Sequence, residues 1–168
     1  MSEKVTDIRF GGIKRLYGHQ QFDWLQEAHF CVVGIGGVGS WTAEALARTG
    51  VGKITLIDLD DICATNVNRQ IHALTGTIGQ AKVDAMKARC ELINPQCQVH
   101  VIDDFITLDN IQEHIQGFDY VIDCIDAVKE KAALIAHCKR NKLPIITTGG
   151  AGGHTDPCKG ALYFAQAI

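Results

Sequence analysis

The sequence predicts an α/β protein with a Rossmann-like, doubly wound and mostly parallel sheet that carries helices on both faces. Strand-like and helix-like segments alternate five times along the 168 residues. Segments such as residues 31–34 and 120–123 are continuously apolar, as buried parallel strands are. A glycine-rich loop joins the first strand to the first helix. With 46% apolar residues, the chain is able to build a single core.

Three parts follow one another along the chain. Residues 1–29 carry large apolar side chains spread among polar ones, which predicts a short helical lead-in packed on the domain. Residues 30–157 hold the alternating strands and helices. Residues 158–168 form a tail that ends on apolar residues and continues none of these patterns.

The first elements are defined by local signals. The strand over 30–34 is followed by a helix over 40–49, which Ser40 caps and Gly50 ends. The next helix carries one apolar stripe and ends at Asn94-Pro95. The remaining predictions are strands over 53–58, 98–102, 120–124 and 145–148, and helices over 80–93, 108–116 and 128–141.

Composition excludes several classes of protein. The net charge of −3 gives no overall attraction to nucleic acid. The start of the chain lacks an apolar signal core, and we expect neither membrane association nor export, which makes the cytoplasm the expected location. Seven cysteines without any CxxC pair predict reduced thiols that serve as small apolar side chains, and no zinc site. The tryptophans, Trp24 and Trp41, are interpreted as packing residues.

The glycine loop predicts a phosphate-binding turn. Its four glycines, Gly34, Gly36, Gly37 and Gly39, permit a tight turn and let backbone N–H groups approach an anion at the start of a helix. Asp58 follows 19 residues after Gly39, at the end of the second strand, where a carboxylate binds ribose hydroxyls. These features alone favour a dehydrogenase that binds NAD.

Further polar segments argue against hydride transfer. They are NVNRQ over 66–70, GQAK over 79–82 and DCID over 123–126. Together with the glycine loop, they make the chain similar to the adenylating domain of the ubiquitin-activating-enzyme-like superfamily, to which ThiF, MoeB and HesA belong. RFGG and RLYG within 9–18, VVGIGGVGSW over 32–41, NRQIHAL over 68–74 and TTGGAGG over 147–153 resemble the branch of tRNA threonylcarbamoyladenosine dehydratases.

The resemblance implies a reaction with ATP and Mg²⁺. A carboxylate, that of threonylcarbamoyladenosine in tRNA, attacks the α-phosphate to give an acyl-adenylate, and ring closure then releases AMP. Arg69 and Lys82 would stabilise charge on the phosphates, and Asp126 would hold Mg²⁺. Asp58 would bind the ribose, and Asn66 would orient phosphate or ribose, unless it only forms a turn.

The resemblance also implies partners. An arginine near the N-terminus would reach the ATP of the second subunit in a homodimer, and Arg15 is preferred over Arg9 for that role. Residues 149–153 would line the substrate mouth. A cysteine desulfurase and its sulfur acceptor are implied as further partners beside the modified tRNA.

Three alternatives stay open. Adenylation of the C-terminal glycine of a sulfur-carrier protein would use the same nucleotide site, although the absence of CxxC pairs argues against it. A dehydrogenase that binds NAD is the alternative from another class. Because family members continue well past residue 157, the chain is expected to be C-terminally truncated, with an uncovered sheet edge that favours association. In that case the domain would bind nucleotide without turnover.

Overall fold

A computed structural model describes residues 8–149 and 162–165, and it confirms the predicted doubly wound sheet. The strands are ordered β3-β2-β1-β4-β5-β6. The first five run parallel, and β6 pairs antiparallel with β5. Their bounds are β1 His29–Val33, β2 Lys53–Ile57, β3 Gln98–Ile102, β4 Tyr120–Asp123, β5 Ile145–Thr148 and β6 Leu162–Ala165.

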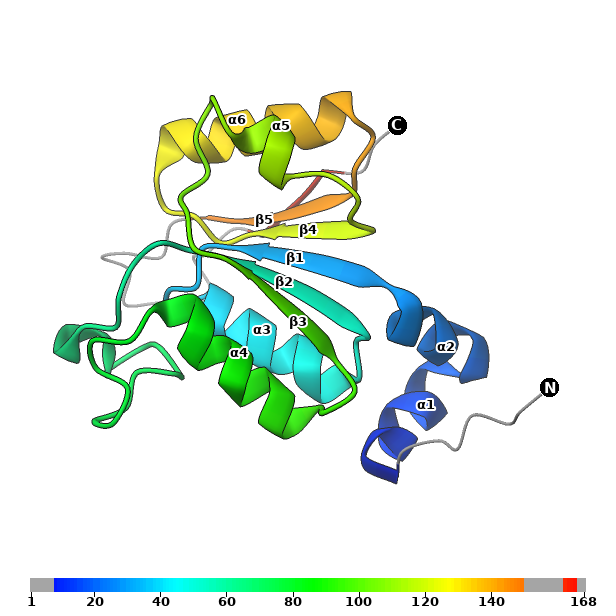
Figure 1. The fold of residues 1–168 in the computed structure, drawn as a ribbon. Coiled ribbons are helices and arrows are strands. Elements are labelled where there is room, and N and C mark those ends of the chain that lie inside the picture. The colour runs from blue at the N-terminus through cyan, green and yellow to red at the C-terminus, as the bar shows by residue number, and fades with distance from the viewer. Residues whose placement is uncertain (1–7, 150–161, 166–168) are drawn as a thin grey trace.

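Helices cover both faces of this sheet (Figure 1). Two of them, α3 (Gly39–Thr49) and α4 (Lys82–Ile93), lie on one face, and α5 (Ile111–His114) and α6 (Val128–Arg140) lie on the other. In the sheet, β1 lies between β2 and β4, so the strand order reverses between β1 and β4. In folds of this kind, ligands bind beyond the carboxyl ends of the strands where the strand order reverses. The topology therefore directs the search for a site to the ends of β1 and β4.

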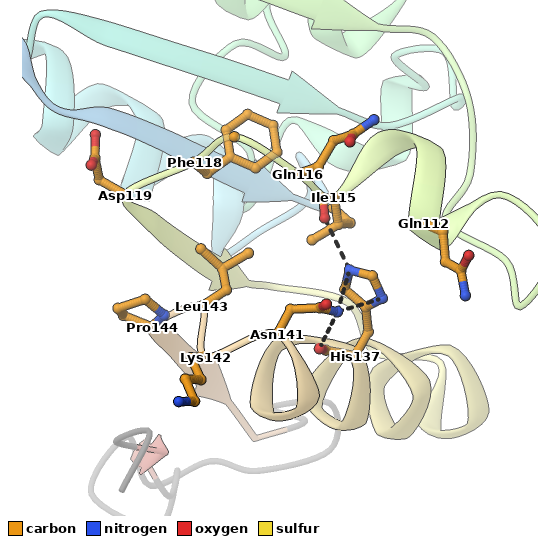
Figure 2. Close-up of a pocket in the computed structure, with 11 residues that line it drawn as sticks. Gln112, Ile115, Gln116, Phe118, Asp119, His137, Asn141, Lys142, Leu143 and Pro144 are labelled. Carbon is orange, nitrogen blue, oxygen red and sulfur yellow. Dashed lines mark hydrogen bonds between the residues drawn. The ribbon is translucent and has the colours of Figure 1, made fainter.

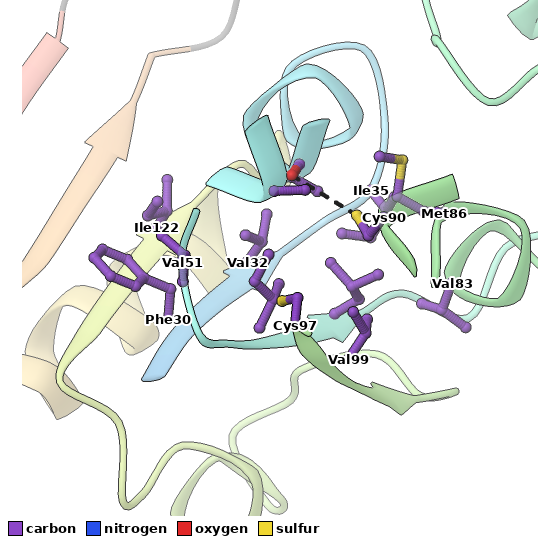
Figure 3. Close-up of a cluster of buried hydrophobic side chains, with 14 of the residues drawn as sticks. Phe30, Val32, Ile35, Val51, Val83, Met86, Cys90, Cys97, Val99 and Ile122 are labelled. Atoms are coloured by element: carbon purple, nitrogen blue, oxygen red, sulfur yellow. Dashed lines mark hydrogen bonds between the residues drawn. The ribbon is translucent and has the colours of Figure 1, made fainter. Parts of the chain in front are cut away.

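Successive side chains of β1 enter two separate cores. Val32 packs with α3 and α4 in the cluster shown in Figure 3, together with Met86 and Cys90 of α4. Cys31 and Val33 pack on the opposite face with residues of α5 and α6. Because both faces are covered, the strand is apolar at consecutive positions, which explains the continuous pattern in the sequence.

The predicted helical lead-in is confirmed for its described part. It consists of η1 (Ile8–Phe10), α1 (Gly11–Tyr17) and α2 (His19–Glu27), at the amino ends of the strands (Figure 1). Buried Phe10 and Phe22 anchor it against Gly50. Gly50 ends α3 with φ +86°, a conformation in which a larger side chain would also meet both rings.

The structure corrects several predicted boundaries. Ser40 does not cap α3: the helix begins at Gly39, and the hydroxyl of Ser40 accepts a hydrogen bond from the backbone of Ile71. The predicted helix over 108–116 is reduced to the single turn of α5, because Asn110 and Thr107 hydrogen-bond each other in a turn before it. Part of the tail, which carried no predicted element, forms β6 on the edge of β5.

The cysteines behave mostly as predicted. None of those in the described residues is bonded to another, and Cys31, Cys90, Cys97 and Cys138 are buried. Burial raises the pKa of each of these thiols, in the case of Cys90 to about 12. They are therefore neutral and serve as small apolar side chains.

A buried carboxylate links α3 to α4. Glu44 accepts hydrogen bonds from Arg89 Nε at 2.5 Å and from Arg48 Nε at 2.7 Å. Burial by itself raises the pKa of Glu44, but the two arginines outweigh it and leave the pKa below its usual value. Since a lowered pKa means that the charged form is favoured in the folded state, the ion pairs stabilise the fold above the pKa of the unfolded chain.

We predict that Glu44→Gln lowers the free energy of unfolding by about 1.5–3 kcal/mol at pH 7, the range for hydrogen bonds to charged groups. The difference from wild type should shrink as the pH falls through the lowered pKa of Glu44, where the wild-type carboxyl takes up a proton. Urea unfolding at several pH values measures this. Glu91→Gln, in an exposed pair with Lys87, is the matched control. A difference that stays constant down to pH 3 would contradict the assignment.

Candidate functional site

A cavity of about 1300 Å³ lies beyond the carboxyl ends of β1, β2, β4 and β5. It is lined by the glycine loop, the segment after β2, the loop after β3 and the loop after β4. Of the predicted site residues, the ones that line it are Gly34, Gly36, Gly37, Asp58, Asn66, Arg69, Lys82 and Asp126. Sequence positions more than 90 residues apart thus meet in one cavity.

The glycine loop holds its shape through backbone contacts that leave no room for side chains. Gly34 has φ +88°, and a Cβ there would lie 3.0 Å from the carbonyl oxygen of Cys124. A Cβ on Gly39, the first residue of α3, would overlap the carbonyl oxygen of Gly34. The loop is therefore packed against β4 and against itself, and it presents the N-terminus of α3 to the cavity, where an anion is favoured.

Asp58 links the glycine loop to the end of β2. Its buried carboxylate accepts hydrogen bonds from the backbone N–H of Ile35 at 2.6 Å and of Asp60 at 2.9 Å. Asp58 lies one residue beyond β2, not within the strand as predicted. Each carboxylate oxygen has a further lone pair, so the group is still able to accept a hydrogen bond from a ligand hydroxyl.

Lys82 is the first residue of α4 and is buried at the cavity wall. Its Nζ lies 2.6 Å from Oδ2 of Asp60 and 3.7 Å from Oδ1 of Asp58. Sequence reasoning missed Asp60, although it stands in the acidic run 58–61. The two carboxylates hold an ammonium group in place at the cavity, and its three protons allow it to bind a phosphate oxygen as well.

Arg69 lies over the glycine loop. Its Cγ and Cδ would be 3.4 Å from a Cβ on Gly37, so the aliphatic stem covers this glycine. Its Nη1 donates to the carbonyl oxygen of Thr65 at 3.1 Å and to Oδ1 of Asn68 at 3.0 Å. The side chain is exposed at the cavity rim, with guanidinium donors left for an anion.

Asn66 lines the cavity and also stabilises a turn. Its Oδ1 accepts a hydrogen bond from the backbone N–H of Cys63 at 2.9 Å and closes the turn of η2 (Ala64–Asn66). This is the turn-forming role left open above. Cys63 is exposed at the same wall, and hydrogen bonds from Thr65 lower the pKa of its thiol.

Asp123, the last residue of β4, and Asp126, in the loop after it, have different environments. Asp123 is fully buried and binds Lys131 Nζ at 2.7 Å and the hydroxyl of Thr147. Its Oδ1 also accepts from the backbone N–H of Ile125 at 3.0 Å, which fixes the loop that follows. Asp126, which lies three residues beyond the end of β4, is exposed in that loop and lines the cavity. Asp123 therefore shapes the loop, and Asp126 is the exposed aspartate of the two at the cavity.

Asp126 suits Mg²⁺ only as one ligand beside the phosphates of a nucleotide. Within residues 8–149, no group of three or more His, Cys, Asp or Glu side chains is placed to hold a metal ion. Mg²⁺ is commonly bound through one or two carboxylates together with phosphate oxygens and water. The exposed carboxylate of Asp126 fits that arrangement, since a nucleotide would bring the phosphate ligands.

The N-terminal arginines lie away from the cavity of their own chain. Arg15 is exposed on α1, and Arg9 precedes that helix and donates to the carbonyl oxygen of Ile93 at 3.3 Å. Both belong to the lead-in at the amino ends of the strands (Figure 1), and neither lines the cavity. Of residues 149–153, Gly149 lines the cavity, and the others lie outside the described residues.

Two further features of the structure do not belong to this site. His72 is buried, and burial followed by the charges of Lys82 and Arg89 lowers its pKa to about 4, so it is neutral and offers no cation to a phosphate. A second hollow of about 660 Å³ lies between α5, α6 and the start of β4 (Figure 2). Its buried histidine, His137, is hydrogen-bonded to the carbonyl oxygen of Ile115 and faces Asn141.

In the described part of the chain, no helix is long and apolar enough to cross a membrane.

Comparison of the sequence and of the fold with known proteins identifies similar enzymes. It is 61% identical over 161 residues to a tRNA threonylcarbamoyladenosine dehydratase of Escherichia coli, an alignment that covers 94% of this chain and 60% of that protein. The crystal structure of the E. coli enzyme in complex with ATP matches with a TM-score of 0.87 at 61% identity, over 90% of this chain and 63% of that one. The complex with AMP matches with a TM-score of 0.88 at 59% identity, over 94% and 67%.

The chain thus spans about 60% of the length of that E. coli relative. The model of the ThiF family matches residues 12–161, which include every segment that lines the cavity. On this evidence the chain belongs to the ThiF family.

Proposed function

We propose that the protein adenylates the carboxylate of threonylcarbamoyladenosine in tRNA with ATP and then closes the ring to give the cyclic form. The observation that carries the proposal is the meeting of Lys82, Arg69 and Asp126 with the glycine loop around one cavity. Two cations, a carboxylate and a helix N-terminus suit a polyphosphate with its metal ion. The similarity to the E. coli dehydratase supports the choice of substrate.

The first step forms an oxygen–phosphorus bond. A carboxylate oxygen of the substrate attacks the α-phosphorus of ATP, and the bond to the bridging oxygen breaks as pyrophosphate leaves. Negative charge grows on the phosphate oxygens during this step. Lys82 as a point charge and Arg69 as a forked donor, both at the cavity wall, would stabilise that charge together with backbone N–H groups of the glycine loop. Mg²⁺ held by Asp126 would neutralise part of the charge on the phosphates.

The second step breaks the acyl–phosphate anhydride formed in the first. A nucleophile within the same modified nucleoside attacks the activated carbonyl carbon and gives up its proton, and AMP departs with the oxygen that came from the carboxylate. Net loss of water from the substrate is thereby coupled to cleavage of ATP. This sequence needs no thiol nucleophile. Of the two thiols at the cavity, that of Cys124 has its pKa raised to about 11 by partial burial, and that of Cys63 has no role in either step.

We extend the proposal to the assembly. A homodimer would place Arg15 or Arg9 of one subunit at the ATP of the other, since neither residue reaches the cavity of its own chain. The cytoplasm is the compartment in which modified tRNA and ATP are both present. A cysteine desulfurase and its sulfur acceptor are the further partners that the family resemblance implies.

The proposal is tested by pyrophosphate release from ATP·Mg²⁺ with three acceptors: tRNA carrying threonylcarbamoyladenosine, unmodified tRNA, and a sulfur-carrier protein ending in glycine. We expect release with the modified tRNA only. Equal release with the carrier protein would replace the proposal by adenylation of that protein. If the chain binds ATP but releases pyrophosphate with none of the three acceptors, it is a nucleotide-binding module. Preferential binding of NAD in calorimetry would indicate a dehydrogenase.

A further inference from the structure

The first turn of α3 is tied to the segment that carries Arg69 by two side chains. Trp41 donates from its indole Nε1 to the carbonyl oxygen of Arg69 at 2.9 Å. Ser40 accepts from the backbone N–H of Ile71 at 3.4 Å through its fully buried hydroxyl. We call these two contacts the Ser40–Trp41 clamp. It connects the helix that follows the glycine loop with a segment about 30 residues further along the chain.

Burial does not account for the position of Trp41. Its side chain is 53% exposed, which is unusual for tryptophan, and Trp24 on the lead-in is exposed to 50%. Trp24 packs its ring edge-on against Phe30 at 6.0 Å between centroids. The indole N–H of Trp41 instead donates to the backbone of Arg69, a predicted site residue. The interpretation of Trp41 as a packing residue is therefore incomplete.

The clamp joins the two separate segments that together line the candidate anion site. The glycine loop supplies backbone N–H groups and the N-terminus of α3. The other segment supplies the guanidinium of Arg69, whose stem lies on Gly37 and whose Nη1 is held by Thr65 and Asn68. These contacts orient the side chain, but they do not join the backbone of Arg69 to α3. The bond from Trp41 makes that connection directly.

We propose that Trp41 and Ser40 are positioning residues that hold Arg69 over the glycine loop in the geometry that binds the phosphates of ATP. This inference rests on the proposed function, because it needs the cavity to bind ATP. Neither residue touches the nucleotide in this account. Their effect is to fix the cation before the ligand arrives, so that less ordering is required on binding.

The test compares Trp41→Phe with Trp24→Phe. Each change keeps an aromatic ring and removes an indole N–H from a half-exposed site, but only the first removes a bond to Arg69. We expect Trp41→Phe to weaken ATP·Mg²⁺ binding in calorimetry about 3- to 10-fold, the equivalent of one net hydrogen bond, and Trp24→Phe to leave it unchanged. Ser40→Ala should weaken binding in the same direction. Melting temperatures identify any variant that fails to fold.

A double-mutant cycle separates positioning from general stability. In an Arg69→Ala background, Trp41→Phe should cause no further loss of ATP affinity, because the side chain that it positions is absent. Additive losses of ATP affinity in the double variant would overturn the inference. Equal ATP affinities of Trp41→Phe and wild type would overturn it too. The proposed function stands in both cases. Failure of the wild-type chain to bind ATP·Mg²⁺ would overturn the proposed function together with the inference.

Discussion

Replacement of Lys82 by alanine is expected to lower the rate of pyrophosphate release from ATP about 100- to 1000-fold, the usual effect of removing one preorganised donor to developing charge. The ammonium group of Lys82 is buried at the cavity, 2.6 Å from Asp60 and 3.7 Å from Asp58. Its loss removes a cation from the phosphates and leaves two carboxylates unbalanced beside them. The repulsion between these carboxylates and the nucleotide adds to the loss.

The matched control is Lys87→Ala on the same helix, whose amino group is exposed and lies 4.0 Å from Glu91. That variant should release pyrophosphate at the wild-type rate. Initial rates with modified tRNA at saturating ATP measure both variants, and thermal melting verifies that they are folded. A Lys82→Ala rate within a factor of about three of wild type would contradict the role of Lys82 in charge stabilisation.

The second large effect is expected from Gly39→Ala. The added methyl group would overlap the carbonyl oxygen of Gly34 and would also lie 3.3 Å from the Cβ of Cys124. Backbone has to move to relieve this overlap, and overpacking of this kind costs about 1–3 kcal/mol. Because the strain falls on the loop that is proposed to bind phosphate, we expect ATP affinity to drop about 5- to 150-fold.

Gly76→Ala provides the comparison, since a Cβ at that position would meet nothing within 4 Å. Isothermal calorimetry with ATP·Mg²⁺ should give the wild-type dissociation constant for Gly76→Ala. Wild-type affinity in Gly39→Ala, with an unchanged melting temperature, would mean that the glycine loop does not bind the nucleotide.

Local signals in the sequence were sufficient for most of the fold. The apolar runs of β1 and β4 are continuous because both faces of the sheet are covered, and the glycines at 34 and 39 stand where the backbone excludes a side chain. The apolar stripe predicted for α4 packs into the core on one face of the sheet. The pairing of β6 with β5 was not predicted, because the four residues of β6 carry no period and their partner strand is set by the tertiary structure.

The sequence predicted most of the residues that meet at the cavity but not their contacts. Spacing places Asp58 and Asp126 after strands at one edge of the sheet, and the family resemblance adds Arg69 and Lys82. It does not indicate that Lys82 pairs with Asp60, that Asp123 is buried under the loop of Asp126, or that Ser40 and Trp41 bind the segment around Arg69. Each of these contacts joins separate elements, so only the folded chain specifies them.

The most direct test of the account is a crystal structure of this chain with ATP and Mg²⁺. We expect the triphosphate in the 1300 Å³ cavity, with Nζ of Lys82 and the guanidinium of Arg69 within hydrogen-bonding distance of its oxygens and Asp126 on the metal ion. A nucleotide bound elsewhere, or bound in the cavity with Lys82 and Arg69 directed into solvent, would contradict it.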